Sequence, residues 1–476
     1  MKLRSLGLAA TILSSAALVA CGGSSSISSS STARGDLRVI HAASDAPPVN
    51  VNANGSAVAG LQGVNYGAGS PRIRLATGTY QVAVDGLLPG DATTTVIDAP
   101  IDIVRGEITN VLAIGQLGDD SFQPMVFQTP IESISAGEVR VQVAHASRAA
   151  DIAAASVDVY LLEPGQDPGG MGTTALNFAF GETLGPVTVG AGTYRIAVTA
   201  PDDAHTILFD TGEISLPGGS DLLVAAVDNV GAEDSLIRLL VSTGDGNDFT
   251  LLDKDATAEV RAVHAAAGVS DADVFADSPT AGLSEALVAE QLVFRASRTV
   301  DEVPPADDYT LAVNEFGGPF AGAPIRARNI SIEAGIYYTV IAAGELGEEL
   351  FPILAVDDRR NIATEARVRA IHAASVAGTV DVYVAPTGVI VAADFINGNA
   401  IVDGYLAVPN FAVGDVTDYL SLDEGNYDVF VVVGGDTVAI EAINVALDEG
   451  DIYTLIATNP DVDEGFAEAG FMILVD

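Results

Sequence analysis

Four histidines recur at the same place in a repeated pattern, and their side chains are the best candidates for chemistry in this sequence. They are His41, His145, His264 and His372. An imidazole can bind a metal ion or act as a general base. However, no Cys accompanies these histidines, and no nucleophile stands beside them in a distinctive local motif. We therefore predict neither a metal site nor a His–Ser catalytic pair at these positions.

The neighbours of each histidine indicate a structural role instead. The first copy reads Arg38-Val39-Ile40-His41-Ala42-Ala43, and alternate residues of a β-strand share one face. His41 therefore lies on the apolar side with Val39, while Arg38 points to the opposite side. We expect each histidine to be buried at a strand end and to hydrogen-bond backbone carbonyls of the following loop. The later equivalents of Arg38 are Arg261 and Arg369. A polar residue of the next strand is a second candidate partner: Asn50, Asp158, Asp273 or Asp381.

Four tyrosines form a second recurring set, and each begins a strand directly after a turn. They are Tyr80, Tyr194, Tyr309 and Tyr427. This position is typical of a tyrosine corner, in which the ring packs in the core and the hydroxyl binds a loop carbonyl. We predict a structural role for these residues rather than the stacking of a ligand.

Two acidic loops carry oxygen atoms at spacings that Ca²⁺ can use. The residues concerned are Asp245, Asp248, Asp461 and Asp463. Neither loop follows the twelve-residue EF-hand pattern, and isolated acidic loops are commonly solvated turns. Calcium is thus the one cofactor that the sequence leaves open, and no other cofactor is predicted.

The first 20 residues are predicted to be a signal peptide. Lys2 and Arg4 precede an apolar segment that ends in Leu18-Val19-Ala20-Cys21, and this ending resembles a bacterial lipoprotein signal. The lone Cys21 would then carry the lipid anchor, and residues 21–35 form a Gly/Ser-rich tether. Gly22 stands where an inner-membrane retention signal would have Asp. We expect attachment to the outer membrane of a Gram-negative bacterium, facing the periplasm or the exterior.

Composition excludes several classes of protein. The 476 residues include 21 basic and 64 acidic side chains, which give a formal net charge of −43. Removal of Lys2 and Arg4 with the signal changes this balance to 19 − 64 = −45. Such a chain does not bind nucleic acid, because binding a polyanion requires clustered Lys and Arg. A single Cys excludes internal disulfides. The 49% of hydrophobic residues predicts a folded protein.

The recurring segments predict four domains. The histidine motif is followed each time by a Val-Asp-Val-Tyr-like strand, a tyrosine-led strand, a continuous apolar run and a closing strand. Such short segments, rich in Val, Ile, Tyr and Thr and separated by Gly, Pro, Asp and Asn, are typical of antiparallel β-sandwiches. The predicted repeats cover residues 36–130, 138–252, 258–357 and 366–476. We expect seven strands in each repeat, and one short helical turn at Leu283–Leu292.

The order of the repeats also predicts an overall shape. An odd number of up-and-down strands places the two ends of a domain at opposite poles, and the linkers between the repeats are short. Neighbouring sandwiches should therefore stack end to end. At roughly 30 Å per sandwich, the four would form a rod of about 120 Å.

These motifs resemble the domain of unknown function 4397 family, which is typical of bacterial surface and secreted proteins. Its opening pattern, approximately R-V-x-H-A-S-P-D-A-P-x-V-D-V, is matched from Arg38 to Val51. Its middle part, a tyrosine-leucine segment before a glycine-tyrosine strand, is clearest from Thr417 to Tyr427. The fourth copy lacks the Asp-Ala-Pro step, and the third diverges around Glu285 to Arg298. The resemblance implies an immunoglobulin-like sandwich outside the cytoplasm and lends no catalytic residues.

Two functions follow from these observations. The first is a non-enzymatic cell-envelope lipoprotein whose Ig-like array binds a protein or glycan, or serves as a structural spacer. The alternative is an envelope hydrolase or glycan-modifying enzyme with its site at a domain junction. A cleft that gathers carboxylates and a histidine from two repeats would favour the enzyme.

Overall fold

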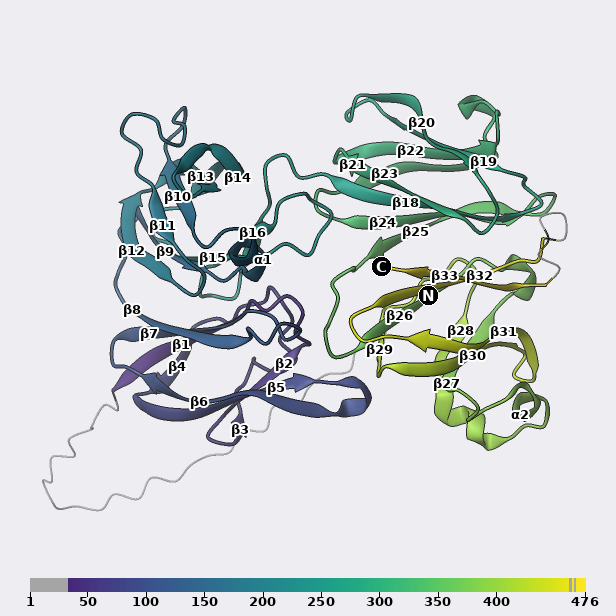
Figure 1. Cartoon of the computed structure of the whole chain (residues 1–476), viewed down its shortest axis with the longest axis horizontal. Helices are drawn as coiled ribbons and strands as arrows, with labels where there is room; N and C mark the ends of the chain where they lie inside the picture. The colour runs from purple at the N-terminus through teal and green to yellow at the C-terminus, as the bar shows by residue number, and fades with distance from the viewer. Residues whose placement is uncertain (1–32, 462–464, 466–467) are drawn as a thin grey trace, which may run out of the picture.

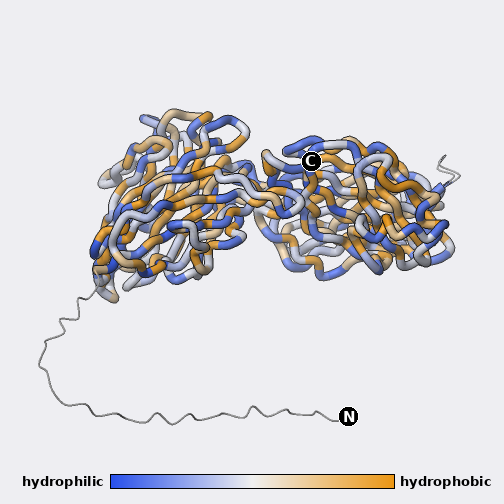
Figure 2. The backbone as a smooth tube through the Cα atoms, turned by 90° about the horizontal axis from the view of Figure 1, so that it is seen from below, coloured by the Kyte–Doolittle hydropathy of each residue, from blue (hydrophilic) through white to orange (hydrophobic). Residues whose placement is uncertain are grey.

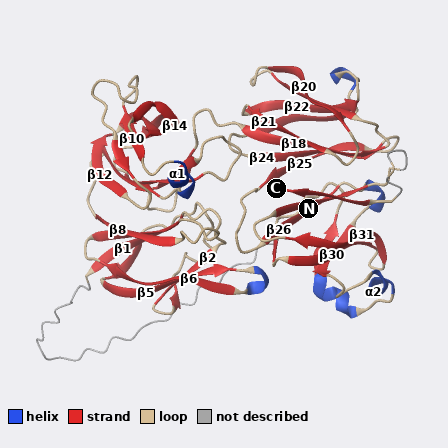
Figure 3. Ribbon diagram, viewed as in Figure 1, coloured by secondary structure: helices blue, strands red, loops and turns tan. Residues whose placement is uncertain are grey.

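The computed structural model describes residues 33–461, 465 and 468–476, and this part of the chain is almost entirely β (Figures 1 and 3). Its strands form four consecutive groups of two sheets, which confirms the predicted tandem array of β-sandwiches. The signal segment, Cys21 and Asp463 lie outside the described residues. No helix within the described residues is long and apolar enough to cross a bilayer.

Repeat 1 shows the plan that all four groups share. One sheet has the order β4-β1-β7-β8 and the other the order β3-β2-β5-β6. β1 and β7 run parallel, and all other neighbours are antiparallel. The strands are β1 (Arg34–His41), β2 (Val49–Ala53), β3 (Ser56–Ala57), β4 (Ile73–Ala76), β5 (Gly78–Leu87), β6 (Thr93–Ile103), β7 (Glu107–Ile114) and β8 (Gln123–Pro130), with a 3-10 turn η1 (Pro89–Asp91).

Repeat 2 keeps this plan and adds a helix and a ninth strand. Its sheets have the orders β12-β9-β15-β16-β17 and β11-β10-β13-β14. The helix α1 (Arg148–Ala153) occupies the loop after the histidine strand. The strands are β9 (Glu138–His145), β10 (Val157–Leu162), β11 (Leu176–Phe178), β12 (Thr183–Gly190), β13 (Gly192–Ala200), β14 (Asp203–Leu216), β15 (Asp221–Asp228), β16 (Ile237–Ser242) and β17 (Phe249–Leu251).

Repeat 3 has eight strands in the same two orders, β21-β18-β24-β25 and β20-β19-β22-β23. The segment expected to form a helical turn is the ten-residue edge strand β20, so that prediction was wrong. Its Leu, Ala, Glu and Gln favour a helix, but pairing with β19 overrides this local preference. The strands are β18 (Ala258–Ala267), β19 (Ala272–Ser278), β20 (Leu283–Leu292), β21 (Ser297–Val303), β22 (Ala306–Glu315), β23 (Ile325–Ile332), β24 (Tyr337–Glu345) and β25 (Leu350–Asp357), with the turn η2 (Phe320–Gly322).

Repeat 4 has the sheets β29-β26-β32-β33 and β28-β27-β30-β31. An insert between β27 and β28 carries α2 (Ala392–Ile396) and η4 (Ala400–Tyr405), and a short turn η3 (Ser375–Ala377) follows the histidine. The strands are β26 (Ala366–His372), β27 (Val380–Pro386), β28 (Leu406–Phe411), β29 (Leu420–Leu422), β30 (Gly425–Val433), β31 (Thr437–Leu447), β32 (Ile452–Thr458) and β33 (Gly470–Val475).

The expected end-to-end rod is wrong, because the repeats pack side by side in pairs. In each repeat the first and seventh strands are parallel, and the eighth is antiparallel to the seventh. An eighth strand therefore returns the chain to the pole where it entered. The prediction of seven strands missed this return. We call the sheet that contains the first and seventh strands the interface sheet, and the other the outer sheet.

The interface sheets of repeats 1 and 2 pack face to face, as do those of repeats 3 and 4 (Figure 1). Each contact is a shared apolar layer of small and branched side chains. The layer between repeats 1 and 2 contains Ile40, Ala42, Leu112, Ile114, Met125, Ala144, Ala146, Leu223, Ala225, Val227 and Leu240. The layer between repeats 3 and 4 contains Val263, Ala265, Ile341, Ala343, Ile353, Ala355, Ile371, Ala373, Ile456, Met472 and Leu474.

The two pairs form two lobes that meet at a narrow junction (Figure 2). Arg360, from the linker before repeat 4, donates to the carbonyl oxygens of Ser44 and Ala46 in repeat 1, at 3.0 and 2.9 Å. On the other side, the Ala232 amide donates to the Gly335 carbonyl across repeats 2 and 3, at 3.2 Å. The lobes are thus linked by hydrogen bonds as well as by the chain.

Candidate functional site

Three of the four recurring histidines bind the loop that follows their strand. The Nε2 atom of His41 lies 3.0 Å from the Pro47 carbonyl oxygen, and that of His372 lies 2.7 Å from the Gly378 oxygen. His264 approaches the carbonyls of Val269 and Ser270 at 3.2 and 3.1 Å. All three side chains are buried. Burial lowers the pKa of each, to about 4 for His41, so the neutral ring donates to the loop.

His145 is the exception. Its side chain is 1% exposed, and within the described residues neither ring nitrogen has a hydrogen-bond partner. Phe178 and Phe180 each make an edge-to-face contact with the ring, with centroids 5.8 and 6.2 Å away. The loop after β9 forms α1, capped by Ser147, and no carbonyl of that loop binds the imidazole.

The sequence also suggested that a polar residue of the second strand binds each histidine. None of these four residues does so in the structure. They accept backbone amides of nearby segments instead. Asp273, for example, accepts the amides of Gln291 and Gly317 at 2.9 and 2.8 Å. The corresponding acceptors in the other repeats are Asn50 for Gly63, Asp158 for Asp202, and Asp381 for Asn410.

All four recurring tyrosines donate their hydroxyl to a carbonyl four or five residues upstream. The donor–acceptor pairs are Tyr80–Ala76 at 3.1 Å, Tyr194–Gly190 at 2.9 Å, Tyr309–Pro304 at 2.7 Å and Tyr427–Asp423 at 3.1 Å. A further pair of tyrosines, which the sequence reasoning missed, accepts amides in the turn before the seventh strand. These are Tyr338 with Glu333 and Tyr453 with Asp448, at 3.1 and 3.0 Å.

The arginines opposite the histidines lie between paired repeats rather than in solvent. In repeats 3 and 4 they exchange partners across the interface: Arg261 donates to Asp476, at 2.6 and 2.9 Å, and Arg369 donates to Asp357. The two aspartates occupy equivalent positions at the ends of the eighth strands. This reciprocal contact is typical of a two-fold related interface. The sequence reasoning placed the arginines on the correct face but missed the aspartates.

The first pair of repeats uses a different polar set at its interface. Arg140, which is 1% exposed, donates to both carboxylate oxygens of Asp221 at 2.8 and 2.6 Å, and Arg72 of repeat 1 reaches the same carboxylate at 2.7 Å. These guanidinium groups help hold the pKa of Asp221 below its usual range, against the effect of burial. Asp228 accepts the hydroxyls of Ser44 and Ser147, each at 2.7 Å.

Three of the four calcium candidates lie within the described residues, and each accepts a backbone amide. Asp245 accepts the Asn247 amide at 2.9 Å, Asp248 accepts the Thr243 amide at 3.0 Å, and Asp461 accepts the Gly268 amide at 2.6 Å. Asp461 of repeat 4 thus contacts repeat 3, whereas Asp245 and Asp248 belong to the loop between β16 and β17 of repeat 2. Among the residues that the structure describes, no three His, Cys, Asp or Glu side chains gather to hold a metal ion.

A cleft between repeats 2 and 3 collects several carboxylates. Its volume is about 810 Å³, and its charged lining residues are Asp210, Glu233, Asp234, Asp253, Asp255, Glu302, Arg195 and Lys254. Burial raises the pKa of Glu233. However, Glu233 accepts from Arg238 at 2.8 Å and Asp210 from Arg195 at 2.7 Å, and no histidine lines the cleft. Among the described residues, the cleft therefore gathers carboxylates from two repeats but not the histidine that would favour the enzyme hypothesis.

Similarity to solved structures is weak. The chain aligns with the Bacillus anthracis TIE protein at 9% identity and a TM-score of 0.15, over 86% of this chain and 65% of that one. It therefore spans slightly less than two thirds of that protein. Two B repeat units of the collagen binding protein of Staphylococcus aureus align at 10% identity and a TM-score of 0.12, over 92% and 98% of the two chains. These scores are too low to carry a functional argument. No curated protein matches the chain.

The family comparison is decisive. The Domain of unknown function (DUF4397) family matches residues 35–160, 258–383 and 391–472. These matches cover more than half of the chain, and they contain the histidine strands of all four repeats. They confirm the resemblance seen in the sequence motifs. The chain belongs to the DUF4397 family.

Proposed function

We propose that this protein is a non-enzymatic cell-envelope lipoprotein, anchored through Cys21, that displays two paired β-sandwich lobes to bind a protein or glycan. One observation carries the proposal: the polar side chains that recur in the repeats are bound to structural partners, with His145 as the exception. Three of the four histidines bind loop carbonyls, the tyrosines bind turn carbonyls, and the arginines bind interface acceptors. Groups used in this way are not available for turnover.

The compact pairing favours binding over a spacer role. A protein folded back on itself extends less far from an anchor than a rod of the same domains. In addition, the insert of repeat 4 presents apolar side chains to solvent, as expected of a surface that meets a partner. These exposed residues are Val389, Val391, Ile396 and Ile401, and Leu406 follows at the start of β28.

The anchor and the binding role require separate tests. Intact mass analysis of the protein from a Gram-negative host should show a lipid-modified Cys21, and the variant Cys21→Ala should remain unmodified. A soluble form, residues 22–476, should capture an envelope or extracellular protein or glycan, and Ile396→Asp should weaken that capture. Ile152→Asp is the matched control, because Ile152 is also exposed, at 66%, but lies in repeat 2. Hydrolytic turnover by the purified soluble form would contradict the proposal.

A further inference from the structure

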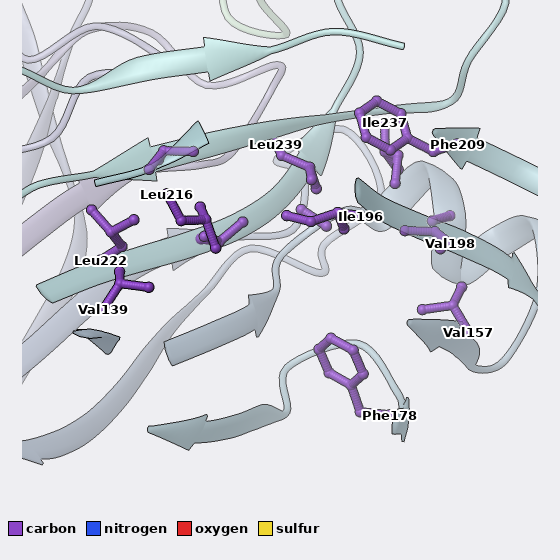
Figure 4. Packing of buried hydrophobic residues seen from close by; sticks show 14 residues of the cluster. Val139, Val157, Phe178, Ile196, Val198, Phe209, Leu216, Leu222, Ile237 and Leu239 are labelled. Atoms are coloured by element: carbon purple, nitrogen blue, oxygen red, sulfur yellow. The ribbon is translucent and has the colours of Figure 1, made fainter. Parts of the chain in front are cut away.

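The interior of repeat 2 is incompletely filled. A cavity of about 330 Å³ lies between its two sheets. A second cavity of about 260 Å³ shares Ile196 and Val224 with the first. Figure 4 shows the buried side chains around this interior, among them Phe178, Ile196 and Leu239. Protein cores are normally packed without voids of this size, and the first volume lies in the range of small-molecule sites, ~300–1,000 Å³.

The first cavity is lined almost entirely by apolar side chains from both sheets. Its lining continues to the surface at the edge between β11 and β12. There Leu176 and Val187 are 39% and 48% exposed, and both also line the cavity. The loop before β11 contributes Gly172, Thr173 and Thr174 to the same wall. An elongated apolar molecule thus has a continuous apolar path from solvent to the interior.

One buried polar group faces this apolar space. His145 lines the cavity, and both of its ring nitrogens lack a partner within the described chain. Burial lowers the pKa of His145, so the ring is neutral at pH 7 and offers one donor and one acceptor. A buried polar group without a partner is costly. A hydroxyl or carboxylic acid group carries both a donor and an acceptor, so it can bind the ring nitrogen that faces the cavity, whether that nitrogen is protonated or not.

This combination is particular to repeat 2. Repeat 4 has a cleft of about 520 Å³ at the corresponding edge, but His372 is already bound to the Gly378 carbonyl. His41 and His264 are likewise bound to their loops. Only in repeat 2, of the four described histidine strands, does an unbound histidine meet an unfilled core.

We propose that repeat 2 binds a single-chain apolar molecule with one hydrogen-bonding head group, of the fatty acid or long-chain alcohol class. The head group lies at His145 and the hydrocarbon chain lies between the sheets. Burial of each CH₂ group adds to the affinity, so the hydrocarbon chain supplies most of the binding and His145 selects the head group. This proposal is independent of the protein or glycan binding described above.

The test uses the soluble protein, residues 22–476, with dodecanoic acid and 1-dodecanol as ligands and calorimetry as the measurement. Saturable binding to one site is expected for both. His145→Met removes the head-group partner and should weaken both ligands tenfold or more, while the hydrocarbon probe diphenylhexatriene, which has no polar group, still binds. Loss of the probe together with the two ligands would contradict the assigned role of His145. Absence of binding to the wild-type protein would overturn the proposal.

Filling the cavity tests its location. Val143→Phe, in β9, should reduce the affinity for all three molecules at least tenfold while leaving the melting temperature equal or higher, because it fills a void. Val187→Asp, at the exposed mouth, should weaken binding without altering the core. The matched control is Val384→Phe in the cleft of repeat 4, which should bind as the wild type does. Unchanged binding by Val143→Phe, or loss of binding only in Val384→Phe, would overturn the assignment to repeat 2.

Discussion

At the scale of single residues, the recurring tyrosines differ in how far their hydroxyl groups are removed from water. Tyr309 is 1% exposed and donates to the Pro304 carbonyl, whereas the hydrogen bond of Tyr427 lies at the surface. We expect Tyr309→Phe to lower the free energy of unfolding by about 1–2 kcal/mol, and Tyr427→Phe by less. Denaturant titration of both variants checks this order. Equal losses would show that burial does not determine the contribution of the bond.

Burial of the histidines predicts that the stability of the protein falls at acidic pH. The folded state lowers the pKa of His41 to about 4 through burial and the nearby Arg360, whereas the unfolded value is about 6.5. The contribution to stability is therefore complete above pH ~6.5 and is lost as the pH falls toward 4, because only the unfolded chain takes up the proton. At pH 5 the free energy of unfolding is therefore lower than at neutral pH by about 2 kcal/mol on account of His41.

The measurement is the free energy of unfolding between pH 7.5 and 5. His41→Gln, which can still donate to the loop, should flatten this dependence. His205→Gln is the matched control, because His205 is exposed and contacts solvent in both states. A steep loss that persists unchanged in His41→Gln would contradict the assignment.

At the scale of elements, the paired interface sheets depend on buried charge. Asp357 is fully buried and accepts from Arg369, from the Thr339 hydroxyl at 2.7 Å and from Arg261 at 3.4 Å. We expect Asp357→Asn to cost about 3–5 kcal/mol, since it leaves buried guanidinium groups without their counter-charge. The neighbouring Asp358→Asn should cost at most ~1 kcal/mol, because that ion pair with Arg367 is 55% exposed on the aspartate side. Equilibrium unfolding of the two variants makes the comparison.

The same interface shows how far the sequence could predict the structure. Strand alternation was sufficient to place His41 and Arg38 on opposite faces, because that relation is local. The pairing of repeats is not a local relation, but one feature of the sequence does indicate it. The run Val111-Leu112-Ala113-Ile114 is apolar at every position, which is typical of a strand buried on both faces, and all four residues are indeed buried. The sequence analysis assumed that each sheet is buried on one face only, and so it did not use this signal. The free nitrogens of His145 depend on the path of a neighbouring loop, which no motif encodes.

At the scale of the whole molecule, the arrangement into two lobes predicts a compact particle. A globule of this length has a radius of gyration of about 23 Å, and the lobed shape in Figure 2 raises this somewhat. A 120 Å rod would have a value of about 35 Å. Small-angle X-ray scattering of residues 22–476, in salt sufficient to screen the mutual repulsion of the acidic surface, should therefore give less than ~30 Å. A radius of gyration near 35 Å would instead support the end-to-end rod.

The face-to-face layer of each lobe also constrains how such a chain can evolve. A sandwich without its companion would expose Ile341, Ile353 and their neighbours, which are now sealed inside the lobe. Gain or loss of one repeat by unequal recombination would leave such a face open to aggregation. Gain or loss of two would not. Viable relatives that keep this interface should therefore carry even numbers of repeats. The unit gained or lost in evolution is then a pair of repeats rather than a single domain.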